Sequence, residues 1–594
     1  MRRSAANAPE APGSARAPAK KPRPSAEGPR EKEGVRETVE AVVVAMILAL
    51  LVRGFEAEAF VIPTGSMAPT LMGRHKEILC PQCGYLYAVN ASDEVESTNG
   101  VLPRGRRVYS GICVNCRFQA HVDDAPSFKG DRILVMKFPY DLSFLPGASG
   151  PERWDVVVFR YPEEPEVSYI KRLVGLPGEV LKVYFGDVYI KRPGETEFRI
   201  ERKPLRHQRS MQMMVHDDTH RPKALRNRPE WARWSSPEGW REETPGTYVT
   251  AAAPAGPSGW TELRYRHLVP EPEQWDAIAN DRPLPKAPRP TLITDFYSYN
   301  TNLTLESSNL TDYPRGDQEN AWLQPHWVGD LSLSGRLDVK AATGTVRFEL
   351  IEGGVANRCD LDLEKGLATL FHGAEKLGAA PSGIKGPGTH SFEFANMDDR
   401  LTLVVNGRTP FGEGLTYASA APHLAPDRQD LAPAGVAARG ASAAVSDLVL
   451  KRDIYYTQYP SLSDYSQSWE ERAPRRPGDL FDILADPAQF PALGDLRSHE
   501  YPIGPDRFMM LGDNSPRSKD SRGWTTRDRF DPDQPDYGWD STNRSSWEVP
   551  RALVTGKAFF IYWPHGKPFG PDIRINQDFR VPFRPYLERM KWIR

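Results

Sequence analysis

The chain has little excess charge of either sign. Among its 594 residues, 76 Lys and Arg nearly balance 78 Asp and Glu, which gives a formal net charge of -2. Because nucleic-acid-binding surfaces carry a basic excess, the composition does not favour a nucleic-acid partner. The chain is also too long for a single hydrophobic core, so we expect several domains or insertions.

Long apolar runs are scarce as well. The strongest lies in EAVVVAMILALLVRGF, where Ala41–Val52 is unbroken and would extend roughly 18 Å as a helix, against a hydrocarbon core of about 30 Å. Flanking residues lengthen it, and we expect residues 37–58 to form a transmembrane anchor. A disordered basic tail, residues 1–36, precedes it, and the positive-inside rule places this tail in the cytoplasm.

Two other interpretations of this run stay open. It would suit a buried core helix by its length. It would also suit a cleavable signal peptide, because Ala57 and Ala59 form an A-x-A-like site after a positively charged region and an apolar stretch.

Cysteine is scarce, with five residues, and four of them form two close pairs. CPQCG and CVNC are Cys-x-x-Cys knuckles with 29 residues between them, and they resemble a zinc ribbon holding a structural zinc ion. Two disulfides are the alternative, because an extracytoplasmic domain meets oxidising conditions. The paired residues are Cys80, Cys83, Cys113 and Cys116; the fifth, Cys359, is expected in a buried strand.

A serine-containing loop follows the apolar run. In AFVIPTGSMAPTL, residues 59–71, Pro63, Gly65 and Pro69 keep Ser66 out of a helix. Such a loop is able to expose one hydroxyl group. A membrane-proximal turn without chemistry explains this segment equally well when it is taken alone.

A lysine with apolar neighbours lies in EVSYIKRLVGLPGEVL, residues 166–181, which predicts strand, turn and strand. Alternation along the first strand places Tyr169, Lys171 and Leu173 on one face. Desolvation lowers the pKa of a lysine, which then becomes a usable base. Taken alone, a lysine in a strand is more often a surface residue.

The third polar group is FMMLGDNSPRSKDSRGW, residues 508–524, where an apolar strand runs into a charged loop. Asp513, Arg517, Asp520 and Arg522 lie within ten residues of one another, so we expect an internally paired, hydrogen-bonded cluster.

Together these motifs resemble type I signal peptidases, the membrane-bound serine-lysine proteases. The matching stretches, in order, are PTGSMAPTL, KGDRILVMK, YIKRLVGLPGE, LGDNSPRSKDSR and VPRALVTGKAFFIYWP. They cover under half of the chain. The resemblance implies an all-β catalytic core, here residues 59–200 and 490–594, which uses no cofactor for catalysis.

The resemblance also implies roles for the matched polar residues. Ser66 would be the nucleophile and Lys171 the general base, without a histidine. The main-chain N–H of Ser66 and the hydroxyl of Thr64 would form the oxyanion hole.

Three further residues would support this geometry. Ser518 would hydrogen-bond and orient Lys171, while Asp520 and Arg522 would form an ion pair behind the site. Asp131, in KGDRILVMK, is expected to be structural.

The substrate follows from the same resemblance. Type I signal peptidases remove N-terminal signal peptides from translocated secretory precursors, so the expected partners are preproteins with A-x-A-like cleavage sites and membrane lipid. We expect a single-pass protein of the cytoplasmic membrane, with its N-terminus in the cytoplasm and its catalytic domain outside.

Residues 201–300 match none of the motifs and are rich in Pro, Arg and Trp, which predicts an irregular insertion. Within it, we interpret HDDTHRP, residues 216–222, as a surface loop rather than a metal cluster. The segment with the paired cysteines, residues 76–125, is a separate insertion.

Residues 301–455 alternate apolar and polar side chains, with Asn406-Gly407 as a hairpin turn. They predict an inserted β-sandwich that resembles concanavalin-like or laminin-G-like jelly rolls, followed by a linker, residues 456–489. The predicted fold class is therefore mainly β. The sandwich would hold a glycan or protein ligand, and it contributes none of the matched catalytic motifs.

An alternative function is a catalytically decayed envelope protein that binds a glycan or protein partner through the sandwich. Retention of Ser66, Lys171, Ser518 and Thr64 argues against this alternative, because a decayed site would be free to lose them.

Overall fold

The structure is a computed structural model that describes most of the chain. The described residues are 33–51, 57–94, 106–137, 140, 150–162, 164–251, 259–304, 326–418, 425–458, 464, 477–496, 498–524, 547–574 and 580–594. The described residues fall into two units, one before residue 57 and the other from Ala57 to Arg594.

The first unit contains the helix α1, Glu33–Leu51. The apolar residues of α1 belong to the run Ala41–Val52, which the sequence predicts to cross a membrane. Among the described residues, no helix is long and apolar enough to span a bilayer. The anchor predicted at residues 37–58 is therefore not confirmed, and residues 1–32 and 52–56 of the predicted tail and anchor lie outside the described residues.

The second unit is mainly β, as the sequence predicts, and its first sheet carries the predicted catalytic motifs. The strands in spatial order are β1 (Ala57–Val61), β7 (Arg132–Met136), β32 (Val554–Trp563), β8 (Val156–Arg160), β9 (Ser168–Gly175), β30 (Arg507–Leu511) and β31 (Val549–Pro550). Each neighbouring pair is antiparallel. The sheet thus joins motifs that lie hundreds of residues apart in the sequence.

A smaller sheet continues from β9. Its order is β12 (Arg199–Ile200), β11 (Asp187–Lys191), β10 (Val180–Tyr184) and β29 (Glu500–Pro502). Pro177 and Gly178 turn the chain from β9 into β10, and Gly178 has φ +81°, a value that a type II turn requires at this position.

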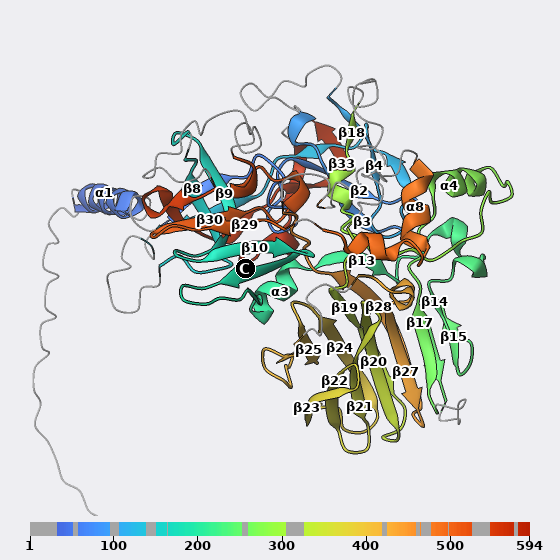
Figure 1. Ribbon diagram of the computed structural model, residues 1–594. Helices are drawn as coiled ribbons and strands as arrows, with labels where there is room; N and C mark the ends of the chain where they lie inside the picture. Colours follow the sequence, from blue (N-terminus) through green and yellow to red (C-terminus); the bar gives the residue numbers. More distant parts are fainter. Residues whose placement is uncertain are drawn as a thin grey trace, which may run out of the picture. The chain divides into compact units, whose positions relative to one another are not determined.

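Two large sheets form the predicted sandwich, whose strands lie together in Figure 1. One has the order β15 (Trp240–Thr244), β16 (Thr247–Thr250), β28 (Ala443–Arg452), β19 (Leu331–Val339), β24 (Gly388–Asn396), β25 (Arg400–Val405) and β26 (Leu415–Thr416), with β13 (Met213–Asp217) also paired to β28. The other has the order β14 (Trp234–Ser235), β17 (Thr261–Tyr265), β27 (Ala434–Arg439), β20 (Thr345–Glu352), β21 (Val355–Asp362), β22 (Leu367–His372) and β23 (Glu375–Pro381).

The core of the sandwich lies between these sheets. The rings of Phe348 and Phe392 stack 3.9 Å apart, one from β20 and one from β24. Cys359 is fully buried in β21, as predicted. Asn406 and Gly407 both have positive φ and form the predicted turn, bridged by Val405 and Arg408.

The sandwich begins earlier than the sequence predicts. The segment 201–300 is not irregular, because β13 to β17 belong to the two sandwich sheets. Its aromatic residues Trp234, Trp240, Tyr248 and Tyr265 are buried in the sandwich core. Burial of these large apolar surfaces stabilises the segment despite its many prolines.

Two small sheets contain the cysteine-bearing segment. One is β3 (Leu86–Asn90), β2 (His75–Leu79) and β6 (Ser127–Phe128); the other is β18 (Leu303–Thr304), β4 (Val108–Ile112) and β5 (Gln119–His121). Their core also includes Trp231, Trp275 and Phe296 from the next insertion. The two insertions therefore share one core.

The remaining elements lie among these sheets. Helices are α3 (Leu205–Met211), α4 (Pro272–Ala279) and α8 (Pro477–Ala485), and the C-terminal hairpin is β33 (Gly566–Arg574) with β34 (Arg580–Pro585). The predicted linker 456–489 is wrong in part, because Leu480, Phe481 and Leu484 of α8 are buried in a hydrophobic core.

Short 3-10 helices connect many of these strands and helices. They are η3 (Ser92–Glu94), η4 (Lys223–Leu225), η5 (Pro229–Trp231), η6 (Ser298–Asn300), η7 (Arg428–Leu431), η8 (Phe490–Gly494), η9 (Ser515–Arg517), η10 (Ser521–Gly523), η11 (Arg551–Leu553) and η12 (Leu587–Arg589).

Candidate active site

Ser66 lies half-buried in a turn between β1 and β2. The main-chain N–H of Asn514 donates to the carbonyl oxygen of Ser66 over 3.1 Å, and its side-chain amide donates to the carbonyl of Gly65 over 3.1 Å. Asp131 holds the far end of the turn, where it accepts a hydrogen bond from the main-chain N–H of Met72 over 2.7 Å. The turn is thus fixed at both ends by segments remote in sequence.

Lys171 faces Ser66 from the middle of β9. Its Nζ lies 2.7 Å from Oγ of Ser66, within hydrogen-bond distance, and also donates to the carbonyl oxygen of Ile170 over 3.0 Å. Only 1% of Lys171 is exposed. The structure therefore brings together the two residues that the sequence predicts as nucleophile and base.

The surroundings of Lys171 lower its pKa to about 8. Burial is the main cause, because a charged ammonium group loses its hydration there. The nearby carboxylates of Asp520 and Asp513 act in the opposite direction, and the Arg522 guanidinium adds to the lowering. A substantial fraction of Lys171 is consequently neutral near pH 8.

Two buried ion pairs lie behind this contact. Asp520 and Arg522 are paired, with Nη2 of Arg522 2.6 Å from Oδ2 of Asp520 and Nε 2.8 Å from Oδ1. Asp513 pairs instead with Arg172, the neighbour of Lys171, with Nη2 2.6 Å from Oδ2 and Nε 2.7 Å from Oδ1. The prediction that residues 508–524 pair among themselves therefore holds for Asp520 and Arg522 but not for Asp513, whose partner lies outside the segment.

Arg172 and Asn514 belong to the candidate site, but the sequence did not single them out. Arg172 is separated from Asp513 by most of the chain, so no local pattern could pair them. Asn514 lies inside the motif LGDNSPRSKDSR, but its contacts to Gly65 and Ser66 depend on the tertiary structure.

Thr64 and Ser518 are the other predicted members of the site. Thr64 is exposed two residues before Ser66. Ser518 is buried, and within the described part of the chain its hydroxyl has no hydrogen-bond partner, so the predicted hydrogen bond to Lys171 is not present in this structure. An added Cβ on Gly512 would be 2.0 Å from Oγ of Ser518 and 2.5 Å from the carbonyl oxygen of Ser66. Close packing at Gly512 therefore holds Ser518 beside the turn that carries Ser66.

The end of the 201–300 insertion also contacts the Ser66 turn, a contact that the sequence did not predict. Tyr299 and Asn300 belong to η6. An added Cβ on Gly65 would lie 2.2 Å from the ring of Tyr299, so only glycine allows this approach. Asn300 exchanges hydrogen bonds with Asn514, which in turn holds Gly65 and Ser66.

The four paired cysteines lie together. Sγ of Cys80 is 3.5 Å from Sγ of Cys116, and Sγ of Cys83 is 3.6 Å from Sγ of Cys113, so no disulfide links them. These distances are close to the roughly 3.8 Å between thiolates that tetrahedral Zn–S bonds of about 2.3 Å produce.

The backbone around the two knuckles repeats. The main-chain N–H of Gly84 donates to the carbonyl of Cys80, and that of Arg117 donates to the carbonyl of Cys113, each over 2.9 Å. Gly84 and Arg117 both have positive φ. Two matching turns therefore present four buried thiols to one point.

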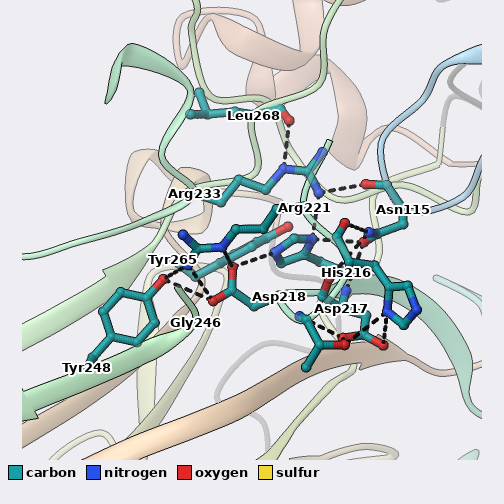
Figure 2. A network of polar contacts seen from close by, with 12 residues as sticks. Asn115, His216, Asp217, Asp218, Arg221, Arg233, Gly246, Tyr248, Tyr265 and Leu268 are labelled. Atoms are coloured by element: carbon teal, nitrogen blue, oxygen red, sulfur yellow. Dashed lines mark hydrogen bonds and ion pairs between the residues drawn. The ribbon is translucent and has the colours of Figure 1, made fainter. Parts of the chain in front are cut away.

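The HDDTHRP segment is part of a polar network rather than a plain surface loop, as Figure 2 shows, and its His216 and Asp218 are buried. Nδ1 of His216 lies 2.9 Å from the side-chain oxygen of Asn115, a residue of the second cysteine knuckle. Asp218 pairs with Arg221 over 2.8 Å and accepts a hydrogen bond from Tyr248 over 3.0 Å. This network ties the cysteine segment to the sandwich, and among the described residues it is not a group of metal-binding side chains.

Comparisons with known proteins bear on part of the chain. Residues 119–229 match the family model described as "Signal peptidase, peptidase S26". The chain is 50% identical over 60 residues to signal peptidase I of Pseudomonas aeruginosa, covering 9% of this chain and 21% of the relative. It is 32% identical over 148 residues to signal peptidase I of Rickettsia massiliae, and this match covers 25% of this chain and 40% of the relative.

The chain thus contains a segment similar to signal peptidases. That segment includes Lys171, and the chain spans between about a fifth and two fifths of the length of these two relatives.

Solved structures were also found to be similar over part of the chain. A carbohydrate-binding module, CBM66 from Bacillus subtilis, has 8% identity and a TM-score of 0.21, covering 37% of this chain and 96% of that one. Galectin LEC-6 from Caenorhabditis elegans has 11% identity and a TM-score of 0.16, and the match covers 21% of this chain and 83% of the galectin chain. Likeness at these TM-scores assigns neither fold nor ligand.

Proposed function

We propose that this protein is a serine endopeptidase that removes signal peptides from translocated precursors. The 2.7 Å contact between Oγ of Ser66 and Nζ of Lys171 carries the proposal. It is supported by the similarity of residues 119–229 to signal peptidases. A decayed binding protein is disfavoured, because a site under no selection has no reason to keep a lysine buried against a serine.

In the proposed reaction, neutral Lys171 accepts the proton of the Ser66 hydroxyl as Oγ attacks the scissile carbonyl carbon. The acyl-enzyme forms, and Lys171 returns the proton to the leaving amine. Water, activated by the same amine, then hydrolyses the ester. The hydroxyl of Thr64 and the main-chain N–H of Ser66 would donate to the oxyanion of each tetrahedral intermediate.

Asp520, Asp513 and Ser518 would support the reaction without taking part in bond making. The Asp520 carboxylate, which is paired with Arg522, offsets part of the lowering of the Lys171 pKa that burial causes. Asp513 fixes Arg172, and with it the strand that carries Lys171. Ser518 fills the space beside Gly512 and the Ser66 carbonyl.

We propose preproteins with small residues at the first and third positions before the cut as the substrates, and membrane lipid as the surroundings. The apolar part of α1 and the residues after it would anchor the chain in the cytoplasmic membrane, with the catalytic unit outside. This arrangement would present Ser66 where the apolar segment of a precursor ends.

The test is cleavage of a purified precursor with an A-x-A site by the full chain in detergent. Wild type is expected to cut it after the second alanine, and Ser66→Ala to leave it whole. The matched control is Ser236→Ala, which removes a hydroxyl that donates to the carbonyl of Glu238 at the surface of the insertion, and it is expected to cut normally. A precursor left whole by wild type, or cut by Ser66→Ala, contradicts the proposal.

We also propose that the four paired cysteines hold one structural zinc ion. Their burial, their mutual distances and the repeated turns support this assignment. With four thiolates the ion has no open position, so its contribution is to folding rather than to peptide cleavage. Cys80→Ser is expected to lower both the zinc content and the thermal stability.

A further inference from the structure

A second group of metal-binding side chains lies apart from the cysteines. It consists of His75, Glu77 and His565, and one ligand atom from each lies within 4.8 Å of the others. His75 and Glu77 are two positions apart on β2 and therefore point to the same face of the strand. His565 lies between β32 and β33, so the tertiary structure alone brings it to this face.

His565 is buried, but its ring nitrogens lack hydrogen bonds within the described part of the chain. Only 5% of it is exposed, and among the described residues neither Nδ1 nor Nε2 has a hydrogen-bond partner. The ring is held by stacking on Phe128, with centroids 4.4 Å apart. A buried imidazole with two unpaired nitrogens is costly, and a metal ion would satisfy one of them.

The separation between His565 and Glu77 fits two ligands of one ion. Nε2 of His565 lies 3.5 Å from Oε2 of Glu77. This is longer than a good N–H···O hydrogen bond of about 2.7–3.2 Å. It matches the roughly 3.3–3.5 Å that separates two ligands around a tetrahedral ion with bonds of about 2.0–2.2 Å.

His75 is oriented in the way that metal-binding histidines usually are. Its Nδ1 lies 2.7 Å from the carbonyl oxygen of Gly73, so this nitrogen carries the proton and donates it. The other nitrogen, Nε2, then carries a lone pair. A backbone carbonyl that fixes the tautomer in this way is a common feature of zinc sites.

We propose that His75, Glu77 and His565 bind one divalent transition-metal ion, of which zinc is the best match to two imidazoles and a carboxylate. Water would fill the fourth position. The ion would link β2 to the segment after β32. Because Gly73 precedes β2 and follows the Ser66 turn, this link would also fix the downstream end of that turn.

The competing interpretation is a metal-free ion pair between protonated His565 and Glu77. The two interpretations differ in metal content, which does not depend on activity. The probe is zinc itself, measured on the full chain purified in detergent after dialysis against zinc and then against metal-free buffer.

The variants are His565→Gln and Glu77→Gln, each of which keeps a side chain of similar size but removes a ligand. His121→Gln is the matched control, because His121 is an exposed histidine at the end of β5. We expect each ligand variant to contain one zinc ion fewer per chain than wild type, and the control to equal wild type. This difference is independent of whether the cysteines hold zinc, so failure of the cysteine assignment would be recognised separately by Cys80→Ser.

The melting temperature is a second measurement, needed in case a ligand variant folds poorly and loses zinc for that reason alone. Added zinc is expected to raise the melting temperature of chelator-treated wild type and of His121→Gln, and to raise it less in Glu77→Gln. Equal zinc content in wild type and both ligand variants would overturn the proposal, as would a ligand variant that zinc stabilises as much as wild type.

Discussion

The side-chain amides of Asn300 and Asn514 form two reciprocal hydrogen bonds, of 2.7 and 2.9 Å. Asn300 belongs to the 201–300 insertion, and Asn514 holds the carbonyl groups of Gly65 and Ser66. The insertion is therefore connected to the Ser66 turn through a buried amide pair.

Asn300→Ala should lower the rate of peptide cleavage. The substitution leaves the Asn514 amide partly unpaired and frees the Ser66 turn to shift. Since a displacement of about 1 Å at a reacting group costs up to about 100-fold, we expect kcat to fall about 10- to 100-fold with little change in KM. Asn280→Ala, an exposed residue of the same insertion, is the control and should behave as wild type. Equal kcat values for the two variants would show that the amide pair does not position Ser66.

Lys171→Arg should be inactive, because guanidinium stays charged and cannot accept the Ser66 proton. For wild type, kcat/KM should rise with pH as the Lys171 ammonium group loses its proton, with a midpoint near its pKa of about 8. The measurement is a pH profile of peptide cleavage spanning about two units on either side of that pKa. A rate that is flat over this range, or an active Lys171→Arg enzyme, would show that another group is the base.

Lys171→Met should be inactive yet folded, and more stable than wild type. The pKa of Lys171 is lower in the folded chain than its ordinary value of 10.5, so the folded state binds fewer protons between about pH 8 and 10.5. The stability contribution of Lys171 therefore rises over this window and is least favourable below it. Near pH 7, Lys171→Met should gain up to about 3 kcal/mol in denaturant unfolding. A variant no more stable than wild type at this pH would mean that the folded chain does not penalise the ammonium group.

Thr64→Ala should weaken catalysis without changing the fold. Thr64 is exposed, so its methyl and hydroxyl groups contribute little to packing. If its hydroxyl donates to the oxyanion, its loss should lower kcat by about 10² to 10³. Thr64→Ser keeps the donor and should retain most of the activity, and a Thr64→Ser enzyme as impaired as Thr64→Ala would argue for a structural role of the methyl group instead.

Asp520→Asn should destabilise the protein. Asp520 and Arg522 are both fully buried, so the substitution leaves the guanidinium group without its counter-charge, at a cost of about 3–5 kcal/mol. Asp447→Asn is the matched control, because Asp447 pairs with Arg336 at the surface with 52% of its side chain exposed. We expect the control to change the free energy of unfolding by less than about 1 kcal/mol. Similar losses in the two variants would mean that the buried pair is not a major source of stability.

Local sequence determined the strands and turns around the site. Apolar alternation in residues 166–181 predicts β9 and the apolar neighbours of Lys171, although a lysine in a strand is by itself more often exposed, and Pro63, Gly65 and Pro69 predict that Ser66 lies in a loop. These features depend on residues within a few positions of one another. Cys-x-x-Cys spacing likewise predicts the two knuckles, because each knuckle is a local turn.

Tertiary structure alone decided the partners of these residues. Composition made residues 201–300 look irregular, yet their strands β16 and β17 pair with β28 and β27. The aromatic residues Tyr248 and Tyr265 of these strands are buried in the sandwich core. The pairing of Asp513 with Arg172, the contact of Asn300 with Asn514, and the approach of His565 to His75 and Glu77 each join segments far apart in the chain. The sequence supplies the chemical groups and their local conformation, whereas burial and chain topology determine which groups meet, because those contacts form only when distant strands pack into one core.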